Sequence, residues 1–352
     1  MTTLFPDAEQ VSAEMLEFAR RAAATLPALA KVDDTPAGCS EKKAVWTDGK
    51  LTLYRYEPRA ESRGLKPLLI CYALVNRPYM MDLQPDRSLI RGLLEAGLDV
   101  YLIDWGYPDG SDRYTSLDDY INGFLDRCVQ FVRKAHKVTA INLLGVCQGG
   151  AFSLCYTAMH PHKVRNLITM VTPVDFKTPD NLLSKWIQGV DTELMARMGN
   201  ISGDWLNAAY LALMPFRLAQ QKYISLVGNA DDAQQLENFM RMERWIFDSP
   251  DQAATAFTQF VRWFYQENRF VTGGLVLGVR KVDLARIGQP VLNLYGLQDH
   301  LVPPSASLAL QKLISSEDYT AVGLEVGHIG MYVSGRAQRE VPGRIAQWLA
   351  AR

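Results

Sequence analysis

Short runs of apolar residues recur along the chain and alternate with longer segments of helical periodicity. Continuous apolar runs that lack a polar face are typical of parallel strands buried on both sides. The predicted strands are 67–75, 99–104, 140–146, 166–174, 290–295 and 320–326. The predicted helices that separate several of them are 116–136, 149–160, 305–314 and 336–350. This alternation predicts an α/β fold with a mostly parallel sheet flanked by helices.

Two other patterns precede the first buried run. Residues 46–56 alternate apolar and polar side chains around Asp48-Gly49, a dipeptide that favours a tight turn, so an antiparallel hairpin is predicted at the sheet edge. Residues 8–31 have helical spacing, and residues 1–40 are therefore assigned to an N-terminal helical arm. The pattern does not distinguish an arm that packs on its own chain from one that contacts a partner.

The alternation of strands and helices stops between residues 176 and 287, where helical spacing continues without a convincing strand. The interval is too long for an ordinary loop. We interpret 177–287 as a helical cap inserted into a core that 41–176 and 288–352 form. The cap is rich in aromatic residues and methionine; most are expected in its own core, and some could line an apolar tunnel.

Composition narrows the class of protein. The chain has 352 residues, 48% hydrophobic content, 21% charged content and a net charge of −1, which are ordinary values for a globular protein. Because it lacks a basic stripe, nucleic-acid binding is not expected. Its five cysteines form no CxxC pair, so neither a disulfide framework nor a metal site is indicated. We expect a cytoplasmic protein, since no signal-peptide pattern and no membrane-spanning apolar run is found.

Cys147 lies in the segment Gly145-Val146-Cys147-Gln148-Gly149-Gly150, directly between a predicted strand and a predicted helix. A nucleophile elbow has its reactive residue in this position, with small residues on both sides that permit the sharp turn. The unpaired N–H groups of the following helix would favour the thiolate form of the cysteine. A buried thiol that only fills the core is the simpler interpretation, but the glycine pattern favours a nucleophile.

A cysteine nucleophile requires a base and an orienting acid. In the α/β-hydrolase fold these follow the nucleophile in the order acid, then histidine, at the ends of later strands. Asp299 follows the predicted strand 290–295, and His328 follows the predicted strand 320–326. The sequence therefore predicts an α/β-hydrolase fold in which Cys147, Asp299 and His328 are the catalytic residues.

Backbone N–H donors are also needed for the oxyanion that forms during attack. One is expected from Gln148, the residue after the nucleophile, and another from the loop after 67–75, with Val75 and Asn76 as candidates. Asn76 could instead be a plain turn residue.

Two further residues near the predicted strand ends are candidates for the pocket. Trp105 follows the predicted strand 99–104 and could contribute to the pocket or only to packing. His300, directly after the acid, could shape the pocket or make a structural hydrogen bond. The other histidines, His136, His160 and His162, lie on or beside charged helical segments and are expected on the solvated surface.

Several segments together resemble the polyhydroxyalkanoate synthases of the α/β-hydrolase superfamily, most closely the catalytic subunit of the two-component class III type. The resemblance covers nearly the whole chain, including the insertion. The segments that carry it are 72–79, Asp104-Trp105-Gly106, Gly145 to Gly150, 166–176, Phe247-Asp248-Ser249-Pro250 and 299–303. Val326 stands where related sequences often have a second glycine before the histidine, a small departure that affects the loop carrying His328.

The resemblance implies polymerisation of (R)-3-hydroxyacyl-CoA, with short-chain monomers such as 3-hydroxybutyryl-CoA, into a polyester with release of CoA. No cofactor is implied, because CoA is a leaving group of the substrate. Cys147 would carry the acyl group as a thioester and His328 would act as the base. Asp299 would orient His328 and would also help, directly or through the histidine, to deprotonate the incoming hydroxyl.

The same resemblance implies partners. A class III catalytic subunit works with a second, non-catalytic synthase subunit, and cap opening is expected to accompany formation of a homodimer. The growing polyester chain places such enzymes at the surface of a cytoplasmic granule.

Two alternatives stay open at this point. A cysteine-dependent hydrolase, such as a dienelactone-hydrolase-like enzyme or a thioesterase, would use the same residues but let water release the acyl group. A structural protein that coats granules would keep the fold without activity, although the presence of Cys147, Asp299 and His328 argues against it.

Overall fold

The computed structural model describes residues 8–29, 38–213, 222–228 and 232–352. The chain forms two compact units. The smaller unit comprises Met1–Pro36 and Asp204–Ser249, and the larger unit comprises Ala37–Gly203 and Pro250–Arg352. All the catalytic, oxyanion and pocket residues predicted from the sequence belong to the larger unit.

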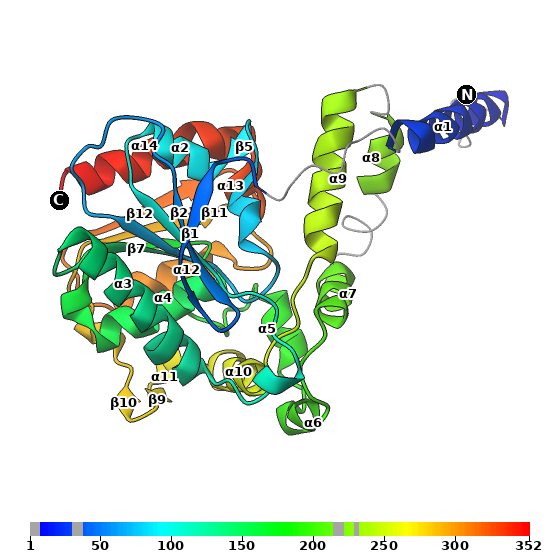
Figure 1. Cartoon of the computed structure of the whole chain (residues 1–352). Coiled ribbons are helices and arrows are strands. Elements are labelled where there is room, and N and C mark those ends of the chain that lie inside the picture. Colours follow the sequence, from blue (N-terminus) through cyan, green and yellow to red (C-terminus); the bar gives the residue numbers. More distant parts are fainter. Residues whose placement is uncertain (1–7, 30–37, 214–221, 229–231) are drawn as a thin grey trace. The chain divides into compact units, whose positions relative to one another are not determined.

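A mostly parallel sheet lies at the centre of the larger unit (Figure 1). Its eight strands are β1 (Lys42–Asp48), β2 (Leu51–Tyr56), β3 (Leu68–Cys71), β6 (Val100–Asp104), β7 (Ile141–Val146), β8 (Val164–Met170), β11 (Val291–Gly296) and β12 (Tyr319–Leu324). Across the sheet they lie in the order β1-β2-β6-β3-β7-β8-β11-β12. The pairs β1–β2 and β2–β6 are antiparallel, and every later pair is parallel. The predicted α/β-hydrolase sheet with an antiparallel hairpin at its edge is confirmed.

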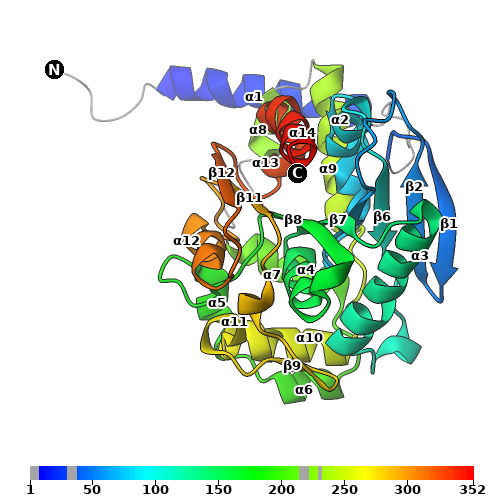
Figure 2. The ribbon, with the colours of Figure 1, turned by 90° about the vertical axis from the view of Figure 1, so that its left-hand side faces the viewer.

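Helices cover both faces of this sheet (Figure 2). α2 (Leu89–Glu95) and α14 (Gly335–Ala350) lie on one face, and α3 (Asp126–His136) and α4 (Gln148–Met159) lie on the other. As a result β3 and β7 are buried along their whole length, which explains why their sequences lack a polar face. The short elements of this unit are β4 (Asp82–Gln84), β5 (Arg87–Ser88), α5 (Leu182–Ile187), α6 (Thr192–Arg197), α10 (Ala254–Phe260), α11 (Arg269–Thr272), α12 (Pro304–Leu308) and α13 (Gly330–Val333).

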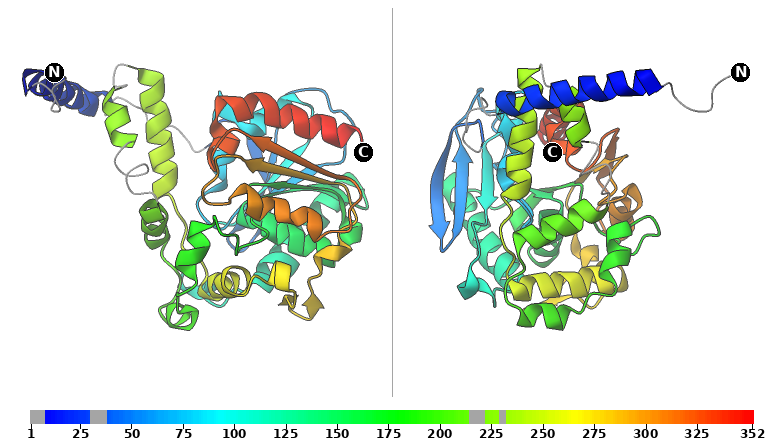
Figure 3. Two further views of the ribbon diagram at one scale, coloured as in Figure 1. Left: turned by 180° about the vertical axis from the view of Figure 1, so that it is seen from behind. Right: turned by 90° about the vertical axis from the view of Figure 1, so that its right-hand side faces the viewer.

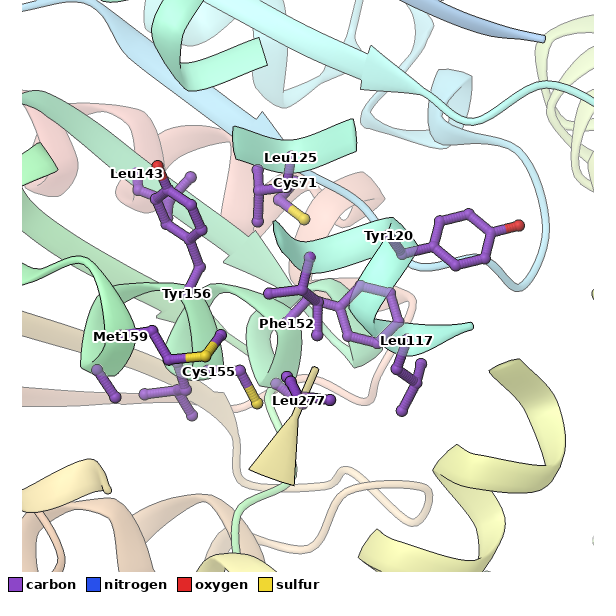
Figure 4. Close-up of a cluster of buried hydrophobic side chains, with 14 of the residues drawn as sticks. Cys71, Leu117, Tyr120, Leu125, Leu143, Phe152, Cys155, Tyr156, Met159 and Leu277 are labelled. Carbon is purple, nitrogen blue, oxygen red and sulfur yellow. The ribbon is translucent and has the colours of Figure 1, made fainter. Parts of the chain in front are cut away.

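The core between the sheet and α4 is continuous (Figure 4). Phe152, Cys155 and Tyr156 of α4 are fully buried together with Cys71 of β3 and Leu143 of β7. Full burial of one large apolar side chain contributes about 1.5–3 kcal/mol to stability. Every residue of α4 is buried, so this helix is held firmly in place from its first turn onward.

The segment between β8 and β11 contains the predicted cap and divides between the two units. α7 (Gly203–Leu213) begins at the boundary, and the helices on either side of 204–249 belong to the larger unit. The prediction that this segment contains no strand is wrong, because β9 (Val276–Leu277) and β10 (Arg280–Lys281) form a short antiparallel hairpin. Strands this short carry no detectable alternation of apolar and polar residues.

The smaller unit is helical. α1 (Ala8–Leu29) packs against α8 (Lys222–Gly228) and α9 (Ala233–Phe247), as Figure 3 shows for α1 and α9. Arg21 of α1 donates a hydrogen bond to the carbonyl oxygen of Gly228 at 3.4 Å, and Thr25 is buried. The helix predicted for the N-terminal arm is therefore present over Ala8–Leu29, while the remainder of the predicted arm up to residue 37 lies outside the described residues.

Two histidines expected on the surface are packed into the larger unit. His160 is 5% exposed, and its Nε2 lies 2.9 Å from Asn122 Oδ1. His136 is half-buried, and its Nε2 lies 2.8 Å from the hydroxyl of Tyr101. The charged neighbours that suggested a solvated face instead pair with one another, as in the 2.6 Å contact between Lys163 and Asp126. His162 is exposed, as predicted.

Burial lowers the pKa of His160 to about 4, and the nearby Lys163 and Arg280 act in the same direction. Since the pKa of an unfolded histidine is about 6.5, His160 contributes stability above pH 6.5 that is lost as the pH falls toward 4. Between pH 7.5 and pH 4.5 this effect should lower the free energy of unfolding by about 1–2 kcal/mol after allowance for solvent screening. We expect His160→Gln to remove this loss of stability. Urea unfolding at pH 4.5 and 7.5 measures the change. The exposed His162→Gln is the control, and an equal pH dependence in wild type and His160→Gln would contradict the prediction.

Candidate active site

Cys147 lies in the turn between the end of β7 and the start of α4. Its backbone angles are φ 53° and ψ −121°, a combination that non-glycine residues rarely adopt. The turn is held by hydrogen bonds on both sides: Cys147 N–H donates to the Met170 carbonyl at 2.9 Å, and the Cys147 carbonyl accepts from Gly150 N–H at 2.9 Å. The Cys147 side chain is half-buried, whereas both sequence neighbours are buried, so the turn makes this thiol accessible.

The glycines after Cys147 are required by close contacts with the sheet. A Cβ atom on Gly149 would lie 2.5 Å from the carbonyl oxygen of Tyr72, and one on Gly150 would overlap the side chain of Thr172. Tyr72 follows β3 and Thr172 lies just after β8, so these contacts are with the strands on either side of β7. Glycine at both positions therefore lets α4 begin directly against the sheet.

Asp299 and His328 come from loops at the carboxyl ends of the adjacent strands β11 and β12. His328 Nδ1 lies 2.7 Å from Asp299 Oδ2, and both side chains are almost fully buried. The other carboxylate oxygen accepts the N–H groups of Leu301 and Val302, each at 2.9 Å. Asp299 is thus held in one orientation, and the contact at Nδ1 leaves Nε2 of His328 for a further partner.

Opposing effects act on the pKa of His328. Burial lowers it, but the charges of Asp299 and Cys147 and the hydrogen bonds to both residues outweigh burial, so the pKa lies well above its usual range. Because the charge of Cys147 is among the effects that raise this pKa, Cys147 lies within electrostatic reach of the imidazole. The structure places Cys147, which follows β7, at the same end of the sheet as the His328–Asp299 pair, which follows β11 and β12.

One hydrogen bond connects the two segments that carry the candidate oxyanion donors. The N–H of Gln148 is the first of α4, and the Gln148 side chain accepts the N–H of Leu74 at 3.0 Å. That bond ties the loop after β3 to the start of α4. Val75 and Asn76 follow in this loop, both half-buried, and Asn76 has φ 57°. The positive φ shows that the chain turns at Asn76. A residue in a turn can still donate its N–H to an oxyanion, so this angle does not distinguish a turn residue from an oxyanion donor.

Trp105 has an evident packing role. It is 7% exposed, its Nε1–H donates to the carbonyl oxygen of Tyr72 at 2.9 Å, and its ring contacts Tyr120 edge to face with 5.5 Å between centroids. His300 is half-buried directly after Asp299. Nearby, Arg77 donates to Asp104 at 2.7 Å and to the Gly106 carbonyl at 2.9 Å, which fixes the far end of the loop after β3.

The sequence reasoning missed two buried tyrosines, Tyr72 and Tyr332, beside this group. Tyr332 packs edge to face on His328 with 6.2 Å between ring centroids, and Tyr72 lies 6.4 Å from Tyr332 by the same measure. No local pattern marks them, because a tyrosine in an apolar run is also an ordinary core residue.

The described residues contain neither a cluster suited to a metal ion nor a membrane-spanning helix. Within residues 8–29, 38–213, 222–228 and 232–352, no group of three or more His, Cys, Asp or Glu side chains is arranged to hold a metal ion. In the same part of the chain, no helix has both the length and the apolar character needed to cross a membrane.

The geometry has counterparts among known proteins. The family model of the alpha/beta hydrolase fold matches residues 66–333. A monoacylglycerol lipase from Paleococcus ferrophilus is 18% identical, with a TM-score of 0.51, over 85% of this chain and 98% of that chain. A hydrolase from Pseudomonas aeruginosa is 15% identical, with a TM-score of 0.50, over 89% of this chain and 99% of that chain. The chain is therefore an α/β-hydrolase-fold protein; at these identities the solved structures show the fold alone.

Closer relatives define the family. A model described as the N-terminus of poly-beta-hydroxybutyrate polymerase (PhaC) matches residues 35–93. A poly(3-hydroxyalkanoate) polymerase subunit PhaC from Allochromatium vinosum is 57% identical over 98% of both chains. The corresponding subunit from Synechocystis is 50% identical over 91% of this chain and 87% of its own length. The chain belongs to the poly(3-hydroxyalkanoate) polymerase PhaC family, and the resemblance seen in the sequence is confirmed.

Replacing Asp299 by Asn should lower the pKa of His328. The amide removes the negative charge that opposes burial, while burial itself persists. Titration of 13C-labelled histidines by NMR, with the His328 signal assigned through His328→Gln, measures the shift. Asp318→Asn removes an exposed carboxylate paired with Arg352 and serves as the control. An unchanged titration of His328 in Asp299→Asn would refute the electrostatic coupling.

Gln148→Met should destabilise the fold by about 1–3 kcal/mol, because the buried N–H of Leu74 loses its acceptor while the side-chain volume stays similar. The free energy of unfolding in urea is the measurement. Gln130→Met is the matched control, since Gln130 is exposed and accepts from Arg133 at 2.9 Å. Equal stability of Gln148→Met and wild type would show that the Leu74 bond is not formed in solution.

Proposed function

We propose that this protein polymerises (R)-3-hydroxyacyl-CoA into a polyhydroxyalkanoate with release of CoA, through a thioester on Cys147. The observation that carries the proposal is a buried His328–Asp299 pair at the same end of the sheet as Cys147, in a chain 57% identical to a PhaC polymerase subunit. Short-chain monomers such as 3-hydroxybutyryl-CoA are the proposed substrates. The chemistry uses no metal and no cofactor, since CoA leaves with each cycle.

In the first step His328 Nε2 accepts the proton of Cys147, and the thiolate attacks the carbonyl carbon of the acyl-CoA. The N–H of Gln148 and an N–H from Val75 or Asn76 hold the negative oxygen of the tetrahedral intermediate. When the intermediate collapses, the C–S bond to CoA breaks and the CoA sulfur takes the proton back from His328. The acyl group is then bound to Cys147 as a second thioester.

In the second step the 3-hydroxyl of another acyl group attacks this thioester. His328, now neutral, accepts the hydroxyl proton, with Asp299 either orienting the imidazole or sharing in the deprotonation. An ester bond forms, the bond to Cys147 breaks, and the sulfur recovers a proton. Cysteine suits this exchange better than serine, because a thioester stays activated toward a hydroxyl whereas an oxygen ester does not.

Water competes with the hydroxyl for the acyl group, so the site must exclude it. We propose that the segment 177–287, inserted between the two parts of the α/β core at 41–176 and 288–352, acts as the cap that does so. Opening of the cap accompanies homodimer formation and binding of a second, non-catalytic synthase subunit. The working enzyme lies in the cytoplasm at the surface of the polyester granule, with 1–40 as an N-terminal arm.

The deciding experiment is a CoA-release assay with (R)-3-hydroxybutyryl-CoA, with and without a class III second subunit. We expect CoA release with growing turbidity and a polyester product by mass spectrometry, and a loss of about 10³-fold or more in Cys147→Ala. Cys39→Ser, a half-buried cysteine outside the site, is the control. Free 3-hydroxybutyrate as the sole product would instead indicate a cysteine hydrolase. CoA release unaffected in Cys147→Ala would eliminate the nucleophile.

A further inference from the structure

The loop after β3 carries the candidate oxyanion donors Val75 and Asn76, and hydrogen bonds hold it on both sides of them. On one side the Leu74 N–H donates to the Gln148 side chain, at the start of α4, at 3.0 Å. On the other side the Arg77 side chain donates to the end of β6. Because β3 lies between β6 and β7 in the sheet, the loop is tied to the segments at the ends of both neighbouring strands.

The anchor at Arg77 is a closed group of three hydrogen bonds. Arg77 Nη2 donates to Asp104 Oδ2 at 2.7 Å, and Arg77 Nη1 donates to the Gly106 carbonyl at 2.9 Å. The other carboxylate oxygen of Asp104 accepts the Gly106 N–H at 3.0 Å. The side chains of Arg77 and Asp104 are only 12% and 13% exposed. A planar guanidinium that uses two of its nitrogens in this way is fixed in direction as well as in position.

The segment that Arg77 binds is itself fixed. Asp104 is the last residue of β6, which pairs with β2 on one side and with β3 on the other. Gly106 packs so closely on the turn between β1 and β2 that a Cβ atom there would overlap the carbonyl oxygen of Lys50. The ring of Tyr107 lies over the guanidinium, with 4.1 Å between Arg77 Cζ and the ring centroid. Arg77 therefore anchors the loop to the sheet.

The short distance along the chain leaves the donors little freedom. Val75 and Asn76 are the only residues between the two anchored positions. The chain turns at Asn76, where φ is 57°, and Arg77 then has the extended conformation that a following proline favours, with φ −99° and ψ 143°. Pro78 begins the short helical turn η1 (Pro78–Met81), in which every residue is buried. The two anchors thus set the directions of both N–H groups.

We propose that Arg77 and Asp104 are a positioning pair that holds the backbone donors of the loop after β3 in the direction that binds the oxyanion. The inference rests on the proposed role of Cys147 as nucleophile and deepens it. Neither side chain of the pair gains or loses a proton or touches the substrate. Because a preorganised donor stabilises only the oxygen on which negative charge develops, the pair should influence attack of Cys147 on a carbonyl carbon and no other reaction of the same sulfur.

The test compares two reactions of Cys147 in the full chain, each followed by peptide mass spectrometry at one fixed pH. In acylation by p-nitrophenyl butyrate the thiolate attacks the carbonyl carbon, an oxyanion forms, the ester C–O bond breaks and p-nitrophenolate leaves. In alkylation by iodoacetamide the thiolate displaces iodide from a saturated carbon, and no oxyanion forms. The ratio of the two rates reports on the oxyanion donors and is insensitive to the reactivity of the thiolate itself.

In Arg77→Met we expect the acylation rate to fall about tenfold to hundredfold, because a small displacement of a donor is enough to weaken its bond to the oxyanion. The alkylation rate should equal that of wild type. Arg77→Lys should behave similarly, since one ammonium group does not reproduce two fixed hydrogen bonds. Asp104→Asn should also slow acylation. The double variant should lose less than the product of the two single fold-changes, because the two side chains act as one unit.

Arg55→Met is the matched control. Arg55 of β2 donates two hydrogen bonds to the carboxylate of Asp99, at 3.0 and 2.8 Å. Asp99 directly precedes β6, at the opposite end of that strand from Asp104. The variant therefore removes an arginine–carboxylate pair of the same kind without touching the loop after β3, and both rates should equal those of wild type.

Equal acylation rates in Arg77→Met and wild type would overturn the proposal, and so would equal falls in acylation and alkylation, which indicate a general disturbance of the fold. If Arg77→Met does not fold, Arg77→Lys is judged by the same criteria. Absence of acylation at Cys147 in wild type would overturn the nucleophile and the positioning pair together.

The proposed function and the positioning pair can fail separately. Polyester formation by wild type, without a selective loss of acylation in Arg77→Met, would refute the pair alone. A selective loss of acylation in Arg77→Met, in a protein that makes no polyester from (R)-3-hydroxybutyryl-CoA, would refute the proposed function and leave the pair standing.

Discussion

The backbone of Cys147 is the constraint on which the site depends. A non-glycine residue at φ 53° and ψ −121° is strained, and such strain persists only where the surroundings enforce it. Here β7 is buried along its whole length, α4 is buried at every residue, and the turn between them is held by the Met170 carbonyl. Because strand and helix are both fixed, the turn holds Cys147 at the carboxyl end of β7, beside the loops that follow the neighbouring strands.

The carboxyl ends of the parallel strands explain how residues far apart in the sequence meet. The parallel strands β3, β7, β11 and β12 end on the same side of the sheet, so their following loops deliver Tyr72, Cys147, Asp299 and His328 to one place. The buried contact with Asp299 then contributes most to raising the pKa of His328, and together with the charge of Cys147 it outweighs the opposing effect of burial. A positive charge near the sulfur is one condition that makes a cysteine a nucleophile near neutral pH.

The fold alone does not decide the chemistry. Solved structures of a lipase and of another hydrolase share the fold at 18% and 15% identity, and their similarity says nothing about the substrate of this chain. The family is defined by relatives such as the PhaC subunit of Allochromatium vinosum, aligned over 98% of this chain. What distinguishes a polymerase from a hydrolase with the same site is whether a hydroxyl or water reaches the acyl group, and this depends on groups around the sulfur.

Local sequence determined the parts of this protein that depend on neighbours along the chain. Periodicity and glycine placement predicted the strand, turn and helix around Cys147, the positions of Asp299 and His328 after strands, and the antiparallel hairpin, because each of these features depends on residues adjacent in the sequence. The burial on both faces predicted for residues 320–326 is wrong, because β12 is the outermost strand of the sheet and only its last residue is buried. The tertiary structure alone decided the hydrogen bond from the Leu74 N–H to the Gln148 side chain, the ring contact of Tyr72 with Tyr332, the burial of His160 and the division of the chain into two units. Each of these joins segments distant in sequence, and no residue pattern within one segment reveals which distant side chain it will meet.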